Sequence, residues 1–517
     1  MAIIALDVIV CILTVAVLYW LYIRSASVSY SSPPGPPGLP FLGNLYDVPS
    51  HEAWRKYVQW SCQYLSDIIR LNVFGTNIIV VNSLRAAIDL FDRRSTIYND
   101  RPHMTMISDL IGMGWTLALL PYGERWRDMR KALHRDLNYD SVKQFRDVHI
   151  QACHEFLRRL VSRPERFRED IRHMTGRIIL RVAYGIDVES ENDRYIAFAE
   201  GATEAFSSTV NAGSYLVDSI PILRYLPEWF PGANFQRRAR MWRPAVNDML
   251  NEPFRFVKKR MLGDGALNEC TATSLLESIP QSGKDPAYME GVVKDTLATI
   301  YAAGADTTVA ALASFFLAMT LYPEVQKKAQ EAIDKVIGPE RLPDFSDYES
   351  LPYITAIMNE SLRWHPVISL NIPHRLSEDD VYNGYFLSKG SVIVGNSWAI
   401  LHDELTYPDP SSFNPDRFMK DGKLNPDVLD PDTAAFGFGR RKCPGIHLVK
   451  ESLWVSIASI LASFTIEPAK GQNGEEIKPP EEYLPGLLSH PAPFTCAISP
   501  RTAKHEELIA STVHEEA

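Results

Sequence analysis

Apolar residues recur along most of the chain at the spacing of helices rather than of strands. Three long stretches show this clearly: residues 294–321, 323–337 and 447–464. The second begins at Pro323 and stops before Gly338, and a proline in the first turn with a glycine past the end is typical of helix boundaries. Short β-branched runs at 68–73 and 77–81 predict a small sheet near the start of the chain. The pattern therefore predicts a mainly α fold with small β-sheets.

The first strongly apolar stretch covers residues 2–23 and contains only one acidic residue. At about 1.5 Å per residue it is long enough to cross a bilayer core. No Lys or Arg precedes it and Arg24 follows it, which places the body of the protein on the cytoplasmic side. A cleaved signal peptide is the alternative, because residues 25–27 fit a cleavage site, but the basic n-region is missing. We expect a single transmembrane anchor at 1–23.

A proline-rich segment at 24–45 follows the apolar stretch and includes the sequence SPPGPPGLP. Such a segment forms neither a helix nor an interior strand and acts as a stiff hinge. No linker-like change in composition interrupts residues 46–500, so we expect one catalytic domain there. The tail at 501–517 is acidic, and we expect it to be disordered.

Composition and charge exclude several classes of function. The formal net charge of −10 argues against nucleic acid as the main partner. Six cysteines at irregular spacing form neither a disulfide framework nor a zinc-binding pattern, so a reducing cytosolic environment is the simpler inference. No dinucleotide-binding glycine fingerprint is present, and we predict no flavin or nicotinamide domain.

One cysteine lies in a glycine-rich, basic loop just before the last apolar helix. The loop reads FGFGRRKCPG and ends at Gly445, with its thiol at Cys443. The basic residues 440–442 and the N-terminus of the following helix supply positive charge, which favours the thiolate form that binds metals. Glycines allow the backbone to approach a flat ligand closely. A buried structural cysteine is the alternative, but the electropositive setting favours a metal-binding thiolate.

This loop resembles the cysteine loop of the cytochrome P450 family, Phe-x-x-Gly-x-Arg-x-Cys-x-Gly, at every position. The matching residues are Phe436, Gly439, Arg441, Cys443 and Gly445. The resemblance implies the cytochrome P450 fold, with Cys443 as the axial thiolate ligand of a haem b iron. Such a ligand favours cleavage of the O–O bond. It also implies that Arg441 pairs with a haem propionate and that Phe436 and Gly445 lie beside the haem.

Two further segments stand upstream of the loop in the family's order. Glu360 and Arg363 lie on one face of a predicted helix and match the family's Glu-x-x-Arg. Arg417, in the sequence FNPDRF, matches the arginine that joins this pair in a buried triad. A Glu-x-x-Arg pair alone is weak evidence, since most such pairs are solvated. The resemblance implies a structural role beneath the haem for all three residues.

The sequence AGADTT at 303–308 places an acid and two hydroxyls inside an otherwise apolar predicted helix. Gly304 weakens the helix locally, and Thr307 can donate to the carbonyl four residues earlier, which would open a groove for O2. A surface ion pair for Asp306 and an inert hydroxyl for Thr307 are the alternatives. The segment matches the family's oxygen-activation motif without departure, and the resemblance implies catalytic proton handling by Asp306 and Thr307.

The resemblance implies three more haem contacts. Trp126 and Arg130 match the family's Trp-x-x-x-Arg and are expected to reach a propionate, although a stacked surface pair is the alternative. His374 occupies the place where the family has Arg or His against the other propionate. The adjacent Arg375 is a second candidate, and position favours His374.

The function that the resemblance implies is a monooxygenase that inserts one oxygen atom from O2 into a lipophilic small molecule. Electrons are expected from an NADPH-cytochrome P450 reductase, with cytochrome b5 as an optional helper. The chain looks most like fungal microsomal members of the family, which modify terpenoids or other secondary metabolites at the endoplasmic reticulum membrane. Two rivals are an isomerase or dehydratase of the same fold and a non-catalytic haem sensor. Neither rival needs the Asp306–Thr307 pair.

By segment position, the expected walls of the substrate pocket are mostly apolar. They are Met113, Trp115, Leu119, Phe206, Tyr301, Ala302, residues 368–370, Leu487 and Leu488.

Overall fold

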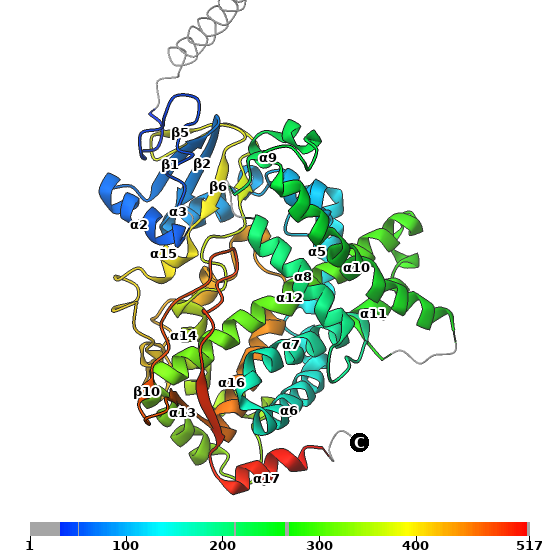
Figure 1. Ribbon diagram of the computed structural model, residues 1–517, viewed down its shortest axis with the longest axis vertical. Helices are drawn as coiled ribbons and strands as arrows, with labels where there is room; N and C mark the ends of the chain where they lie inside the picture. The colour runs from blue at the N-terminus through cyan, green and yellow to red at the C-terminus, as the bar shows by residue number, and fades with distance from the viewer. Residues whose placement is uncertain (1–30, 50, 211–213, 264–267, 514–517) are drawn as a thin grey trace, which may run out of the picture.

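The computed structural model describes residues 31–49, 51–210, 214–263 and 268–513, and the predicted anchor at 1–23 lies outside them. Within these ranges the chain is mainly helical with small sheets at its margins, as the hydrophobic pattern predicts (Figure 1). Helix α12, Pro286–Leu321, runs through the centre of the molecule and is buried along most of its length. It begins at Asp285, whose side chain accepts a hydrogen bond from the backbone N–H of Tyr288.

The sequence AGADTT does not interrupt α12, which stays helical throughout. Gly304 has a packing role instead, because a Cβ at this position would clash with the side chain of Ile179 on α7, Phe167–Tyr184. The glycine therefore allows α7 to pack tightly against the middle of α12.

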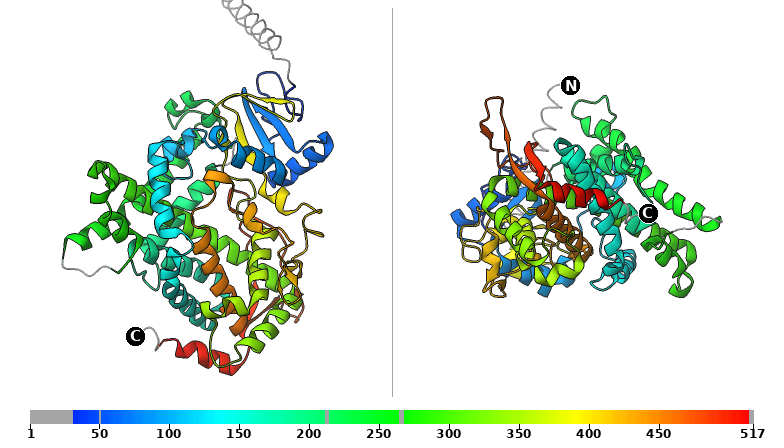
Figure 2. Two further views of the ribbon diagram at one scale, coloured as in Figure 1. Left: turned by 180° about the vertical axis from the view of Figure 1, so that it is seen from behind. Right: turned by 90° about the horizontal axis from the view of Figure 1, so that it is seen from below.

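Helices from distant parts of the chain surround α12. The principal ones are α5 (Glu124–Leu137), α6 (Arg146–Ser162), α8 (Arg194–Thr209), α10 (Asn234–Leu262), α14 (Pro352–Trp364) and α16 (Ile446–Ser463). The predicted helix at 323–337 is α13, Pro323–Val336. Figure 2 shows the same arrangement from behind and from below.

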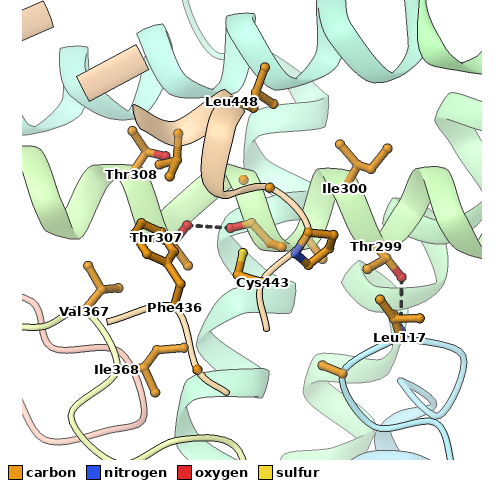
Figure 3. A pocket seen from close by; sticks show the side chains of 18 of the residues that line it. Leu117, Thr299, Ile300, Thr307, Thr308, Val367, Ile368, Phe436, Cys443 and Leu448 are labelled. Atoms are coloured by element: carbon orange, nitrogen blue, oxygen red, sulfur yellow. Dashed lines mark hydrogen bonds between the residues drawn. The ribbon is translucent and has the colours of Figure 1, made fainter. Parts of the chain in front are cut away.

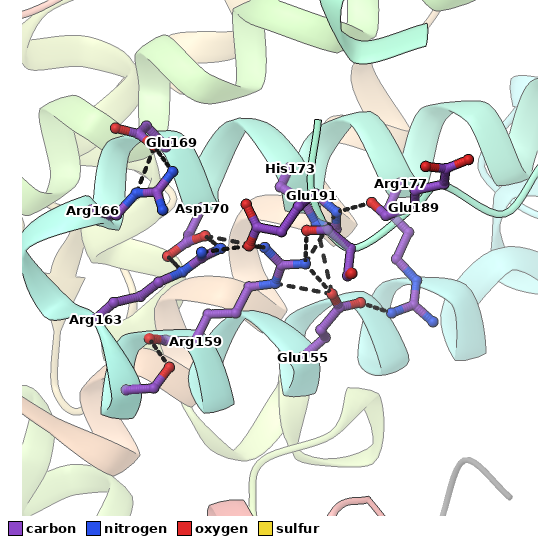
Figure 4. A network of polar contacts seen from close by, with 12 residues as sticks. Glu155, Arg159, Arg163, Arg166, Glu169, Asp170, His173, Arg177, Glu189 and Glu191 are labelled. Carbon is purple, nitrogen blue, oxygen red and sulfur yellow. Dashed lines mark hydrogen bonds and ion pairs between the residues drawn. The ribbon is translucent and has the colours of Figure 1, made fainter. Parts of the chain in front are cut away.

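Helices α6 and α7 are joined by a network of charged side chains (Figure 4). Asp170 of α7 is almost fully buried and accepts from Arg163 at 2.6 Å and from Arg159 at 3.3 Å. Arg159 also donates to Glu155 of its own helix at 2.7 Å. Burying these groups is tolerable only because each charge has an opposite partner. The network fixes α7, which carries side chains that reach α12.

The largest sheet has the strand order β1-β2-β6-β3. Strands β1 (Ile68–Val73) and β2 (Thr76–Val81) form an antiparallel hairpin and confirm the two predicted strands. Strand β6, Val392–Gly395, runs parallel to β2, and β3, His374–Arg375, pairs antiparallel with β6. This pairing holds His374 opposite Ile393. A second sheet of three strands, β9 (Phe464–Lys470), β10 (Glu476–Ile477) and β11 (Cys496–Pro500), follows α16.

The described part of the predicted hinge packs along the first sheet. The backbone N–H of Arg70 donates to the carbonyl of Pro34 at 2.9 Å, and the Asn44 side chain accepts from the backbone N–H of Asn72 at 2.9 Å. Residues 31–45 are therefore tied to the body of the protein.

The expectation of a disordered tail was wrong for residues 503–511. These residues form helix α17, Ala503–Ser511, which buries His505 and Ile509. The two residues are four apart and share one face of the helix. Arg158 of α6 also donates to Thr512 Oγ1 at 2.6 Å, which holds the end of the helix in place.

Within the described residues, α12 and α16 are the helices long and apolar enough to cross a membrane. In each of them 72% of the most apolar window is buried inside the protein. Both are therefore core helices, and their apolar length reflects packing.

Candidate active site

A cavity of about 300 Å³ lies between α12, α16 and the cysteine loop (Figure 3). Cys443 and Phe436 reach it from the loop, and Thr307 and Thr308 reach it from α12. The cavity thus brings together two motifs that are more than a hundred residues apart in the sequence.

The cysteine loop is shaped by its glycines. Gly437 and Gly439 have φ of 75° and 53°, a left-handed conformation that suits glycine. A Cβ on Gly439 would also clash with the carbonyl of Phe91. The backbone N–H of Cys443 donates to the carbonyl of Phe436 at 2.8 Å, and Gly445 forms the N-cap of α16. The sulfur is therefore held at a helix N-terminus in the cavity wall.

Burial raises the pKa of the Cys443 thiol, while the N–H of Gly445 and the charges of Arg130 and Lys442 oppose this rise. Of the three basic residues at 440–442, only Lys442 therefore helps to stabilise the thiolate as expected. The second stabilising charge comes from Arg130 on α5. A thiol in this setting ionises when it binds a metal, because the metal replaces the proton.

Arg440 and Arg441 make other contacts. Arg440 donates to Tyr122 Oη at 2.8 Å. Arg441 donates to three backbone carbonyls, and its guanidinium lies over the ring of Trp126 at 4.6 Å from the ring centroid. Arg441 lines the cavity together with Trp126.

One end of the cavity is strongly basic. Arg101, Arg130, Arg441 and His374 all line it, and Arg130 donates to the carbonyl of Lys442 at 2.7 Å. His374 Nδ1 lies 2.7 Å from the carbonyl of Tyr98, which fixes the imidazole ring. In contrast, Arg375 is 46% exposed at its side chain, 4.0 Å from Asp100, and lies outside the cavity wall. The geometry favours His374 over Arg375 as the ligand contact.

The basic end fits the propionates of a haem. No carboxylate occurs among the described residues that line the cavity, so its three guanidinium groups have no anionic partner there. Burial lowers the pKa of Arg441 to about 10 and also lowers the pKa values of Arg130 and Arg101, and the nearby charge of Asp100 only partly offsets this at Arg441 and Arg101. Buried cations need paired anions. Trp126 Nε1 and Arg101 Nε make no hydrogen bond within the described chain and are available as donors.

Thr307 faces the cavity, and its hydroxyl donates to the carbonyl of Ala303 at 2.7 Å, as predicted (Figure 3). Because its hydrogen is used in this bond, the oxygen presents lone pairs as an acceptor. Thr307 can therefore hold a water or another protonated group at the cavity wall.

Asp306 does not line this cavity. Its carboxylate binds His490 Nε2 at 3.0 Å and Arg172 of α7 at 3.3 Å, with 14% of its side chain exposed. Burial alone would raise the pKa of Asp306, but the hydrogen bond from His490 and the charge of Arg172 outweigh burial and lower it. The carboxylate is therefore ionised at neutral pH.

The predicted triad is present and buried. Arg363 Nε donates to Glu360 Oε2 at 2.7 Å, and both side chains are 0% exposed. Arg417 Nε donates to Glu360 Oε1 at 3.2 Å, and the backbone N–H of Asn414 donates to the same oxygen. Together these bonds join α14 to the segment that leads to the cysteine loop.

The expected pocket walls are confirmed in part: Met113, Phe206, Ala302, Ile368 and Leu488 line the cavity. The other expected wall residues do not line it: Trp115, Leu119, Tyr301, Ser369, Leu370 and Leu487. Tyr301 faces away from it, since its hydroxyl donates to the carbonyl of Tyr195.

Three residues of the site were missed by sequence reasoning: Arg101, Arg172 and His490. Each comes from a segment outside the motifs, and each acquires its role only through tertiary contact. No local sequence pattern distinguishes these three residues from the charged and polar residues that lie on the surface.

Comparisons with known proteins agree with this geometry. The family model described as Cytochrome P450 matches residues 33–497. A cytochrome P450 monooxygenase of Armillaria gallica is 43% identical over 96% of this chain and 97% of its own length. Cytochrome P450 monooxygenase 98 of Postia placenta is 42% identical over 96% of each chain. The tryptamine 4-monooxygenase of Psilocybe cyanescens is 40% identical over 91% of this chain and 93% of its own length.

All three relatives are fungal enzymes, and each match spans nearly the whole of both proteins. The sulfur, the basic end of the cavity and the buried triad all lie within the residues matched by the family model. The chain therefore belongs to the cytochrome P450 family, as an oxidoreductase of its monooxygenase class.

Proposed function

We propose that this protein holds haem b through Cys443 and inserts one oxygen atom from O2 into a neutral lipophilic molecule. The overall reaction converts RH, O2, NADPH and H⁺ to ROH, H2O and NADP⁺. The observation that carries the proposal is that Cys443 and Thr307 face one cavity whose basic end has no carboxylate among its described lining residues. Bound haem supplies the iron that reduces and activates O2.

Residues at the basic end orient the cofactor. The two propionates would be bound by Arg101, Trp126, Arg130, His374 and Arg441, which all line the cavity, and Phe436 and Gly445 line it together with Cys443. The charge-assisted hydrogen bonds of arginine to carboxylates are among the stronger polar contacts in proteins. The cofactor would thus be held by its charged edge and its iron.

The rest of the cavity favours a neutral substrate. Its walls are mostly apolar, and the hydroxyls of Thr116, Thr203 and Thr307 are bonded to backbone carbonyls. An ammonium group buried there would find no carboxylate among the described lining residues, and a buried unpaired charge is costly. We therefore favour a terpenoid or similar secondary metabolite over an amine of the kind named for the Psilocybe relative.

Exposed apolar residues support attachment to the endoplasmic reticulum membrane. Residues 31–49 and the region of α9 (Leu216–Ser219) and η5 (Pro221–Tyr225) lie at the same end of the molecule (Figures 1 and 2). The large apolar side chains exposed in and beside these two regions are Leu39, Phe41, Tyr46, Leu216, Ile222, Tyr225, Trp229 and Phe230. Aromatic residues are typical of membrane interfaces. This end would face the bilayer, with the anchor at 1–23 spanning it and the catalytic domain in the cytoplasm.

A basic surface supports docking of an acidic electron donor. Exposed Arg127, Lys131 and Arg135 lie on α5, the helix that carries Arg130 toward the cysteine loop. We propose NADPH-cytochrome P450 reductase as the donor, with cytochrome b5 as an optional helper. Complementary charge accelerates such encounters and makes them sensitive to salt.

The substrate proposal is tested by optical titration of the ferric protein with sesquiterpenes, polyketides, fatty acids and tryptamine. A neutral lipophile that enters the cavity is expected to shift the haem spectrum by displacing water, whereas tryptamine is expected to bind much more weakly. A comparable shift with tryptamine alone would contradict the proposal of a neutral substrate.

Replacing Thr307 with alanine is expected to reduce product formed per NADPH by about tenfold, the equivalent of one hydrogen bond worth ~1.4 kcal/mol. Without the hydroxyl, protons reach the reduced O2 less selectively and more of it leaves as hydrogen peroxide. The measurement is product, peroxide and NADPH in one reconstituted assay.

Thr320→Ala is the matched control for Thr307→Ala. Thr320 lies on the same helix and donates to the carbonyl of Phe316 at 2.8 Å in the same way, but it does not line the cavity. Unchanged yield in Thr307→Ala, or equal losses in the two variants, would remove Thr307 from the mechanism.

A further inference from the structure

Residues 481–492, here called the C-terminal strap, connect the substrate cavity to α7 and α12. Leu488 of the strap lines the cavity. Two backbone N–H groups of the strap fix its position: that of Leu487 donates to the carbonyl of Ser207 at 3.1 Å, and that of Ser489 donates to the carbonyl of Val367 at 2.8 Å. A substrate that touches Leu488 therefore presses on a segment that is anchored on both sides.

The strap also holds the acid of the oxygen-activation segment. His490, two residues beyond Leu488, binds Asp306 through Nε2 at 3.0 Å, and the two side chains are 15% and 14% exposed. We infer that His490 is a positioning residue that ties the Asp306 carboxylate to the substrate-contacting strap, so that proton supply to O2 reduction depends on this contact. The inference rests on the proposed monooxygenase function.

The electrostatics of this contact support the inference. The low pKa of Asp306 means that its carboxylate is ionised at rest, so it needs donors to hold its position. Its other partner, Arg172 of α7, is 36% exposed and also binds Glu200 of α8 at 3.3 Å. Without His490 the carboxylate would keep one longer contact, at 3.3 Å, to a side chain shared with Glu200.

A second, very small cavity lies beside Asp306. Its volume is about 10 Å³, close to the space needed by a single water. Arg172, Glu200 and Asp306 line it, together with Thr203, which also lines the main cavity. A water here would link the half-exposed Glu200–Arg172 pair to the carboxylate. In the proposed role, His490 holds the carboxylate next to this water from its other oxygen.

The test measures uncoupling, the side reaction in which NADPH, H⁺ and O2 give NADP⁺ and H2O2. The quantity measured is the fraction of NADPH electrons recovered as hydrogen peroxide. The assay uses the full-length haem-loaded protein, the reductase and the neutral sesquiterpene farnesol. His490→Phe keeps a ring but loses the donor, and we expect its peroxide fraction to rise at least about threefold. His490→Gln keeps a donor and is expected to restore most of the coupling. The optical dissociation constant for farnesol is expected to stay within about twofold in both variants.

Arg168→Met is the matched control, because Arg168 anchors the same strap without touching Asp306. It donates to the carbonyls of Pro491 at 2.9 Å and Ala492 at 3.1 Å. If Arg168→Met raises the peroxide fraction as much as His490→Phe, strap anchoring alone explains the effect and the inference fails. It also fails if His490→Phe matches the unsubstituted protein. Failure of the proposed function is a separate outcome, in which no compound gives an oxygenated product while the peroxide fraction still responds to His490.

Discussion

Replacing Cys443 with serine is expected to abolish both the thiolate-type spectrum of the carbon monoxide complex and all monooxygenase activity. The hydroxyl of serine does not ionise at neutral pH and does not supply the electron density of a thiolate. The surrounding contacts remain, because the backbone N–H of residue 443 still donates to Phe436 and the basic end of the cavity is intact. We therefore expect the variant to fold and to retain haem weakly. The measurement is the difference spectrum of the reduced protein.

Cys496→Ser provides the control for this substitution. Cys496 is a half-buried free thiol on β11 and does not line the cavity. Its replacement is expected to leave the spectrum unchanged. A thiolate spectrum that persists in Cys443→Ser would show that another residue is the ligand.

The second large effect is expected from Glu360→Gln. Glu360 is fully buried and accepts hydrogen bonds from Arg363, Arg417 and the backbone N–H of Asn414. Removing its charge leaves two arginine side chains, at most 6% exposed, without their counter-ion, which typically costs ~3–5 kcal/mol. This is a large part of the stability of a typical domain. We expect little folded haem protein, measured as the yield of thiolate spectrum per total protein.

An exposed pair with the same spacing is the control for Glu360→Gln. Glu169 binds Arg166 three residues before it, and the two side chains are 62% and 45% exposed. Glu169→Gln is expected to change the free energy of unfolding by less than ~1 kcal/mol, because exposed ion pairs contribute little. Similar haem yields from the two variants would contradict a structural role for the buried triad.

Local patterns in the sequence predicted the parts of the site that a single segment encodes. The cysteine loop, the Glu360–Arg363 pair and the back-bonded hydroxyl of Thr307 all depend on neighbours within a few residues. The long helices were predictable for the same reason, since a proline at the start and a glycine past the end of an apolar run mark the helix boundaries within the segment itself.

Contacts between distant segments could not be predicted in this way. Arg101 joins the basic end of the cavity through distant partners: it donates to the carbonyls of Ile372 and Pro373, and Arg441 donates to the carbonyl of Asn99 beside it. His490 meets Asp306 across 184 residues of sequence. That the Asp306 side chain points away from the cavity could have been predicted from the sequence. Adjacent helix residues point about 100° apart, so only one of Asp306 and Thr307 can point directly into the cavity. The acidic composition of the tail predicted disorder, and the prediction overlooked His505 and Ile509, the two buried residues that anchor α17.

The central claim is tested most directly by turnover under oxygen-18 gas with the reductase, NADPH and the neutral compound that gives the largest optical shift. The account predicts a product with one oxygen-18 atom, formed only when NADPH is present. A product that lacks the label, or that is rearranged or dehydrated without NADPH, would contradict the monooxygenase assignment and favour an isomerase or dehydratase.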